Sequence, residues 1–210
     1  MKTLQYIVLI ALFGLVAWSC DSDNDTSIVG TEVESVESLL TDQETQDLLF
    51  LREEEKLARD VYLFAYNQHG LKVFQNIAKS EEQHMDRVLA ILTSYGVDDP
   101  ALAESGAFNN PDLQSLYEQL TAKASLSLVD ALEVGAIIED LDIKDLNAMA
   151  VNSAKEDLAL LYSNLACGSA NHMRSFYGQL VANGADYEPQ YISQEELDEI
   201  LASPQGGCGP

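Results

Sequence analysis

Hydrophobic residues recur every three or four positions along most of this chain, a spacing that predicts α-helices with one apolar face. The first such segment begins at Thr41-Asp-Gln-Glu44, which has the form of a capping box, and ends near Gly70. A second segment follows almost at once and stops at Tyr95-Gly96. Because the connection between them is so short, we expect these two helices to be antiparallel neighbours.

The second half of the chain predicts another helix pair. Residues 97–111 are rich in Pro, Gly, Asn and Asp and predict a long crossing loop, after which Pro111 opens a short helix. Further helices are expected from Ser127, from a second capping box that begins at Ser153, and from Ser193. No segment alternates with period two, so the sequence predicts an all-α fold, a four-helix bundle of two antiparallel pairs whose long crossover carries a short extra helix.

Ionisable residues interrupt the apolar faces of these predicted helices. They are Glu55 on the first long helix, Glu81 and His84 on the second, Glu139 and Asp142 on the third, and His172 on the fourth. A spacing of three residues places Glu81 and His84 on one helix face, one turn apart. Glu55, Glu81 and His84 also lie at nearly equal distances from the tight turn between their helices, so we expect their side chains to meet.

A metal ion explains why acids and imidazoles would face an apolar interior. Buried ionisable groups are costly unless something neutralises them, and carboxylates with imidazoles bind iron, manganese or zinc. The alternative is a bundle held partly by buried pairs between acids and basic residues. The basic residues close enough in sequence are Arg52, Lys56, Arg59, Arg87 and Arg174.

The first forty residues differ from the rest of the chain. Lys2 precedes an apolar run of thirteen residues, Tyr6 to Trp18, which is too short for a membrane span and is typical of a secretion signal. Small residues before Cys20 resemble a bacterial lipobox, which implies cleavage before Cys20 and lipidation of its thiol. A plain signal peptide with an incidental Cys is the alternative. We therefore expect a signal peptide at 1–19, an acidic disordered tether at 20–40, a helical domain at 41–203 and a flexible tail at 204–210.

The chain is strongly acidic, with a formal net charge of −24 over 210 residues. Removing residues 1–19 takes away Lys2 and no acid, which leaves 10 basic and 35 acidic residues and a charge of −25. Such a surface repels nucleic acid and attracts cations, although solubility explains most of the charges equally well. The remaining cysteines, Cys167 and Cys208, form a possible disulfide in an oxidising compartment.

Several stretches of the sequence resemble the DUF2202 family of the ferritin-like superfamily. They are Leu51-Arg-Glu-Glu-Glu-Lys-Leu-Ala-Arg-Asp-Val-Tyr62, Val73-Phe-Gln-Asn-Ile-Ala-Lys-Ser-Glu-Glu-Gln-His84, Gly135-Ala-Ile-Ile-Glu-Asp-Leu-Asp142 and Gly168-Ser-Ala-Asn-His172. The resemblance covers about residues 40–200. It implies a di-iron type of bundle, in which two helices each provide a Glu and two provide Glu-x-x-His.

That resemblance implies ligand roles for Glu55, which is preferred over Glu53 and Glu54, and for the other predicted site residues: Glu81, His84, Glu139, Asp142 and His172. The pattern departs at Ser169, where the family motif has a Glu three residues before His172. Either Asp142 takes the place of that carboxylate or the site holds one metal ion rather than two. His172 also lies further from its turn than Glu139, so either the third helix bends near Asp142-Ile-Lys-Asp145 or His172 lies off the centre.

These observations lead us to expect a lipid-anchored, iron-binding bundle of the bacterial cell envelope, at the outer membrane, with manganese or zinc as alternative ions. If the protein is redox-active, the expected chemistry is that of ferrous iron with oxygen or peroxide. The expected partners are the lipid bilayer, through acylated Cys20, and a small oxidant or metal ion, with no nucleic acid. Two rival functions are a metal-free helical adaptor of the envelope and nonspecific cation buffering by the acidic surface.

Overall fold

The computed structural model describes residues 39–208, and within this range every regular element is an α-helix. The helices are α1 (Asp42–His69), α2 (Lys72–Ser94), α3 (Pro111–Ala124), α4 (Leu128–Asn152), α5 (Glu156–Ala182) and α6 (Gln194–Ala202). The predicted all-α fold is confirmed. The predicted signal peptide, Cys20 and nearly all of the predicted tether lie outside the described residues.

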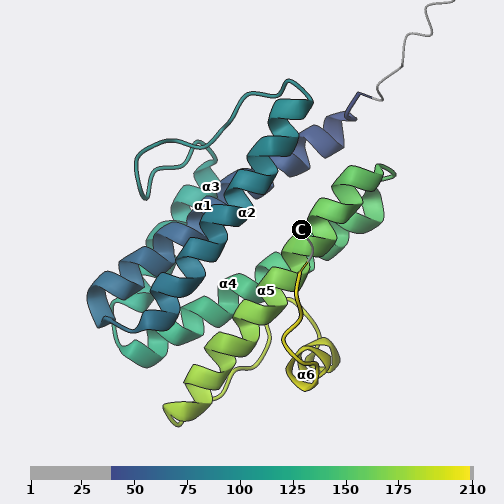
Figure 1. Ribbon diagram of the computed structural model, residues 1–210. Helices are drawn as coiled ribbons and strands as arrows, with labels where there is room; N and C mark the ends of the chain where they lie inside the picture. The colour runs from purple at the N-terminus through teal and green to yellow at the C-terminus, as the bar shows by residue number, and fades with distance from the viewer. Residues whose placement is uncertain (1–38, 209–210) are drawn as a thin grey trace, which may run out of the picture. The chain divides into compact units, whose positions relative to one another are not determined.

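The four long helices form two pairs, α1 with α2 and α4 with α5, which lie side by side in Figure 1. Gly70 ends α1 and makes the sharp turn to α2. Its φ of 70° is a left-handed conformation that glycine adopts without strain. Residues 95–110 form the crossover, after which α3 packs on α1 and α4, and α6 packs on α5. Within residues 39–208, no helix has both the length and the apolar character that a membrane span requires.

Most helix ends follow the predicted capping signals, with one exception. The capping boxes at Thr41 and Ser193 are present, and Asn110 caps α3. The capping box predicted at Ser153 is wrong, because α5 begins after Lys155 and Ser153 instead ends α4. The hydroxyl of Ser153 donates to Glu44 of α1 and accepts from the backbone N–H of Lys155, which lies before the first residue of α5.

Charged residues on α1 hold the crossover in place. Arg52 forms two parallel hydrogen bonds with Asp99, at 3.0 and 2.9 Å. The buried ammonium of Lys56 donates to Asp60 and to two backbone carbonyls of the crossover, those of Glu104 and Ala107. These contacts account for basic residues that would otherwise be available to the acids of the interior.

The apolar core consists of two clusters with a polar layer between them. One cluster includes Val61, Ile77 and Phe176, and the other includes Leu51, Val88 and Leu165. On α1, α2 and α5 the predicted site residues fall at the change from one cluster to the other, and on α4 they come just before it. Apolar packing therefore closes this polar layer from both ends of the bundle.

Candidate metal centre

The structure brings all six predicted site residues into the polar layer of the bundle. Glu55 comes from α1, Glu81 and His84 from α2, Glu139 and Asp142 from α4, and His172 from α5. Each is at least 93% buried: Glu55 is 0% exposed, Glu81 and Glu139 1%, Asp142 2%, His84 5% and His172 7%. His172 therefore does not lie off the centre, because α5 begins only at Glu156, which places His172 16 residues after the start of α5 and Glu139 13 residues before the end of α4.

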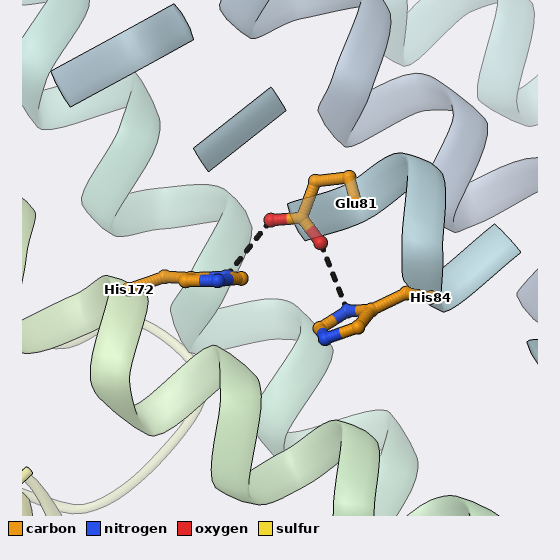
Figure 2. Close-up of side chains that lie close together, drawn as sticks. All are labelled: Glu81, His84 and His172. Atoms are coloured by element: carbon orange, nitrogen blue, oxygen red, sulfur yellow. Dashed lines mark ion pairs between the residues drawn. The ribbon is translucent and has the colours of Figure 1, made fainter. Parts of the chain in front are cut away.

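Glu81 lies between the two imidazoles (Figure 2). Its Oε2 is 2.9 Å from His84 Nδ1, and its Oε1 is 2.8 Å from His172 Nδ1. One ligand atom from each of these three residues lies within 4.8 Å of the others, a spacing at which they can share a metal ion. Two imidazoles and one carboxylate are also the donor set of many non-haem iron(II) sites.

Each imidazole faces a second carboxylate. His84 Nδ1 is 3.2 Å from Glu55 Oε2, and His172 Nδ1 is 3.4 Å from Glu139 Oε2. The centre thus has two halves, each with one His and one Glu of its own, and Glu81 offers one oxygen to each half. The imidazole rings are stacked with centroids 5.4 Å apart.

Several polar atoms of this centre are buried without a hydrogen bond. They are both oxygens of Glu81, Glu55 Oε1, Glu139 Oε2, Asp142 Oδ1 and His172 Nδ1. Glu81 Oε1 and His172 Nδ1 are close, but their geometry does not make a hydrogen bond. Because buried polar atoms normally find a partner, this set fits ligands directed at a cation.

Basic side chains do not neutralise these acids. Among residues 39–208, no Lys or Arg forms an ion pair with Glu55, Glu81, Glu139 or Asp142. Four of the five basic residues considered above contact other groups: Arg52 pairs with Asp99, Lys56 and Arg59 pair with Asp60, and Arg174 donates to the carbonyl of Ile200. This arrangement removes the main support for the alternative of a bundle held by buried Glu–Arg or Glu–Lys pairs.

The clustered acids shift one another's pKa values. Burial raises the pKa of Glu139 to about 7, although His172 acts in the opposite direction. Burial, followed by the charges of Glu55 and other neighbouring acids, raises the pKa of Asp142 well above its usual range. Burial also raises the pKa of Glu55, against the influence of His84. The protein alone therefore keeps protons on some of these acids, and a bound cation would displace them.

The imidazoles and Glu81 instead favour their charged forms. Burial opposes a charge on His172, but Glu81 and Glu139 outweigh it and raise the pKa of His172 to about 10. Glu55 and Glu81 likewise outweigh burial and raise the pKa of His84 well above its usual value. Burial acts to raise the pKa of Glu81, yet His172 and His84 lower it below its ordinary value. Glu81 is therefore the acid of the centre that stays ionised.

A second set of contacts orients the site residues. The hydroxyl of Tyr62 donates to Glu139 Oε1 at 2.5 Å, and Ser80 Oγ lies 2.9 Å from His172 Nε2. Such partners fix the orientation of metal ligands and are commonly needed for full affinity. Neither Tyr62 nor Ser80 is among the site residues predicted from the sequence.

Ser169, the departure from the family pattern, is tied to Asp142. Its hydroxyl lies 2.8 Å from Asp142 Oδ2, and both side chains are buried. Asp142 therefore brings a carboxylate to the position next to Ser169, with its Oδ1 left free of hydrogen bonds. This placement fits the first of the two predicted alternatives, in which Asp142 takes the place of the missing Glu.

Gly168, just before Ser169, provides space for His84. A Cβ atom on Gly168 would lie 2.6 Å from His84 Nε2 and 2.7 Å from its Cε1, and both distances are shorter than normal contacts between non-bonded heavy atoms. The sequence analysis missed this residue, although a glycine in the middle of a predicted helix is the signal that could have found it. The imidazole of α2 thus packs directly on the backbone of α5.

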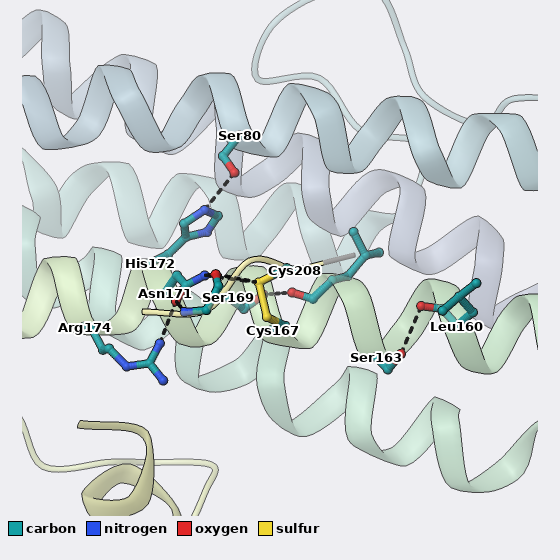
Figure 3. The surroundings of a disulfide bond; sticks show 11 residues. Ser80, Leu160, Ser163, Cys167, Ser169, Asn171, His172, Arg174 and Cys208 are labelled. Atoms are coloured by element: carbon teal, nitrogen blue, oxygen red, sulfur yellow. Dashed lines mark hydrogen bonds between the residues drawn. A yellow bond between two sulfur atoms is a disulfide. The ribbon is translucent and has the colours of Figure 1, made fainter. Parts of the chain in front are cut away.

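The predicted Cys167–Cys208 disulfide is present in the structure (Figure 3). It joins the C-terminal tail to α5 one residue before Gly168. Asn171 adds a hydrogen bond from its amide to the carbonyl of Gly206. The tail is therefore attached to the same stretch of α5 that carries Ser169 and His172.

Fold and site together define a class of protein: an all-helical domain with a buried Glu/His group that could hold a metal ion. The chain belongs to the DUF2202 family, described as an uncharacterized protein domain, whose model matches residues 44–204. The predicted resemblance to DUF2202 is confirmed.

One relative is similar in both sequence and structure. The chain is 49% identical over 165 residues to the uncharacterized protein MJ0754 of Methanocaldococcus jannaschii, a match that covers 78% of this chain and 89% of the relative. The crystal structure of hypothetical protein MJ0754 from Methanococcus jannaschii matches with a TM-score of 0.79 and 48% sequence identity. That match covers 80% of this chain and 96% of the other.

Proposed function

We propose that this protein binds a transition-metal ion, with iron favoured and manganese or zinc as alternatives, in a centre of the ferritin-like type. The observation that supports this most is the carboxylate of Glu81, which is buried between His84 and His172 with no hydrogen bond to either oxygen. Glu55 and Glu139 complete the two halves of the centre, and Asp142 adds a further carboxylate. Two halves that share Glu81 favour two ions over one.

Iron bound in this centre would be able to change between the ferrous and ferric states. On this proposal the protein oxidises ferrous iron with peroxide or oxygen. Each hydrogen peroxide takes one electron from each of two ferrous ions and, with two protons, leaves two waters. The residues of this chain hold the ions, keep their charges neutralised in an apolar interior, and exclude competing ligands through the two flanking clusters.

Metal analysis of the purified protein tests this function. Protein prepared without added metal should contain about stoichiometric metal, and protein stripped with a chelator should bind added ferrous iron or cobalt(II). Glu81→Ala should abolish this binding, whereas Glu82→Ala, at the exposed neighbouring position, should not. Equal metal content in the wild-type protein and Glu81→Ala would contradict the proposal.

A thermal scan separates this function from that of a metal-free adaptor. A metal that binds only the folded state must raise the melting temperature, by an amount that grows with its free concentration. Chelation should therefore lower the melting temperature of the wild-type protein and leave that of Glu81→Ala unchanged. An adaptor without metal would show the same melting temperature in both conditions.

We also propose that the protein is anchored in the bacterial cell envelope through lipidated Cys20. The sequence supports this, because an apolar run that ends at Trp18 is followed by Ser19, Cys20 and then several acids. Incorporation of labelled palmitate should occur in the wild-type protein and be lost in Cys20→Ala. Label that persists in Cys20→Ala would exclude this anchor.

A further inference from the structure

Glu54 is a buried acid that the centre's histidines do not contact. It follows Glu53 and precedes Glu55 on α1, and it is only 3% exposed. Both of its carboxylate oxygens are buried without a hydrogen bond. It borders a small apolar cavity between α1, α3 and α4, whose lining includes Leu57, Leu120 and Ile138. A carboxylate in such surroundings is costly unless a cation or a proton accompanies it.

A row of carboxylates on α4 passes beside Glu54. Glu139, Asp142 and Asp145 follow one another at intervals of three residues, which places them along one face of the helix. Their exposure increases along the row: Glu139 is 1% and Asp142 2% exposed, while the side chain of Asp145 is 16% exposed. The row therefore leads from the centre toward solvent.

Glu54 connects the outer end of this row to the centre. Burial, then the charge of Asp145 and then that of Glu55, raises the pKa of Glu54 well above its usual range. Glu54 in turn contributes to the raised pKa of Asp142. Ile138 and Leu141 line the same cavity as Glu54 and lie one turn before Asp142 and Asp145 on α4, so Glu54, next to Glu55 on α1, packs against the stretch of α4 that carries this row.

Lys144 lies at the outer end of the row. Its ammonium pairs with Asp145, and its side chain is 50% exposed. A lysine in this position neutralises part of the acidic charge when no other cation is near. Because it is half exposed and flexible, it can turn into solvent when a divalent cation takes its place on Asp145.

We propose that Glu54 and Asp145 form a transfer site for a divalent cation, through which the ion passes from the surface to Glu55 and Asp142 of the centre. This inference rests on the proposed metal-binding function. Carboxylate oxygens suit divalent ions that keep some of their water, such as ferrous iron and manganese(II). Acidic groups with low-dielectric walls raise the rate at which cations arrive by roughly 10- to 1,000-fold.

The rate of metal loading tests this inference separately from the final amount bound. Cobalt(II) is mixed with metal-free protein, and its visible absorption is followed until the centre is filled. Glu54→Gln and Asp145→Asn should each load about tenfold more slowly than wild type and reach the same final stoichiometry. Glu82→Gln removes an exposed acid next to Glu81 and should load at the wild-type rate. Circular dichroism of each variant verifies its folding, and Asp145→Asn changes a partly exposed group that the core does not need.

The outcomes distinguish this inference from the proposed function. If Glu54→Gln and Asp145→Asn load as fast as wild type, or if Glu82→Gln slows loading equally, the transfer site is wrong and the metal centre stands. A loss of final stoichiometry without a slower rate would make Glu54 a ligand of the centre instead and also overturn the transfer role. If the wild-type protein takes up no cobalt at all, both proposals fail.

Discussion

Substitution of Gly168 by Ala tests whether the position of His84 depends on the backbone of α5. The added Cβ would lie 2.6 Å from His84 Nε2, about 1 Å inside the usual contact distance of roughly 3.5–4.0 Å. The ring must therefore move, and overpacking of this kind costs about 1–3 kcal/mol. Alanine recovers about 1 kcal/mol of helix propensity, so we expect a net loss of about 0–2 kcal/mol in the free energy of unfolding.

The displacement of His84 should also weaken metal binding. Changes in the residues that orient ligands typically cost about 10- to 100-fold in metal affinity, and we expect a loss in this range for Gly168→Ala. Urea unfolding of the metal-free protein measures the first effect, and cobalt(II) titration of the same samples measures the second.

Gly178 provides a matched control on the same helix. It is exposed, and a Cβ atom there would meet no heavy atom within 4 Å. Gly178→Ala should therefore raise the free energy of unfolding by about 0.5–1 kcal/mol and leave metal affinity unchanged. The reasoning is refuted if Gly168→Ala stabilises the protein as Gly178→Ala does and binds cobalt as tightly as wild type.

Three further predictions concern other side-chain contacts. Tyr62→Phe removes the donor to Glu139 and should lower the free energy of unfolding by about 1–3 kcal/mol, measured in urea on metal-free protein; no change would show that the bond contributes nothing. The hydrogen bonds from Arg52 lower the pKa of Asp99 below 3.8, so this contact stabilises the fold above that pH and is lost as the pH falls through the folded-state pKa. Asp99→Asn should therefore flatten the acid limb of a stability-against-pH curve, and an unchanged limb would count against it. Cys208→Ser opens a link across 41 residues and should cost up to about 4 kcal/mol, a loss that reductant should reproduce in wild type but not in the variant.

The sequence predicted the helices well because their ends are marked by local chemistry. Thr41, Asn110 and Ser193 cap their helices through residues only two or three positions away, which a linear pattern can reveal. The capping box at Ser153 is wrong because α5 begins later, with Lys155 as its N-cap, while the Ser153 hydroxyl donates to Glu44, 109 residues away, and accepts from Lys155. A contact with another helix has no trace in the local pattern.

The sequence predicted the site residues from the helix face that each occupies and from its distance along the helix to the turn. Glu55, Glu81 and His84 meet because their distances from the turn are nearly equal. The sequence could not show that Gly168 makes room for His84 or that Glu54 is buried. Both depend on contacts between helices: α5 against α2 in one case, and α3 and α4 against α1 in the other.

Almost no side chain in the middle of α1 is exposed to solvent. From Leu51 to Asp60 every residue is buried except the half-buried Arg59, and the charges point to different partners: Glu53 to backbone N–H groups and Lys56 to backbone carbonyls of the crossover, and Glu55 to the centre. Adding or deleting one residue here would rotate the following groups by about 100° around the axis and separate them from all of these partners at once. Insertions and deletions should therefore be tolerated in the crossover long before they are tolerated in this stretch.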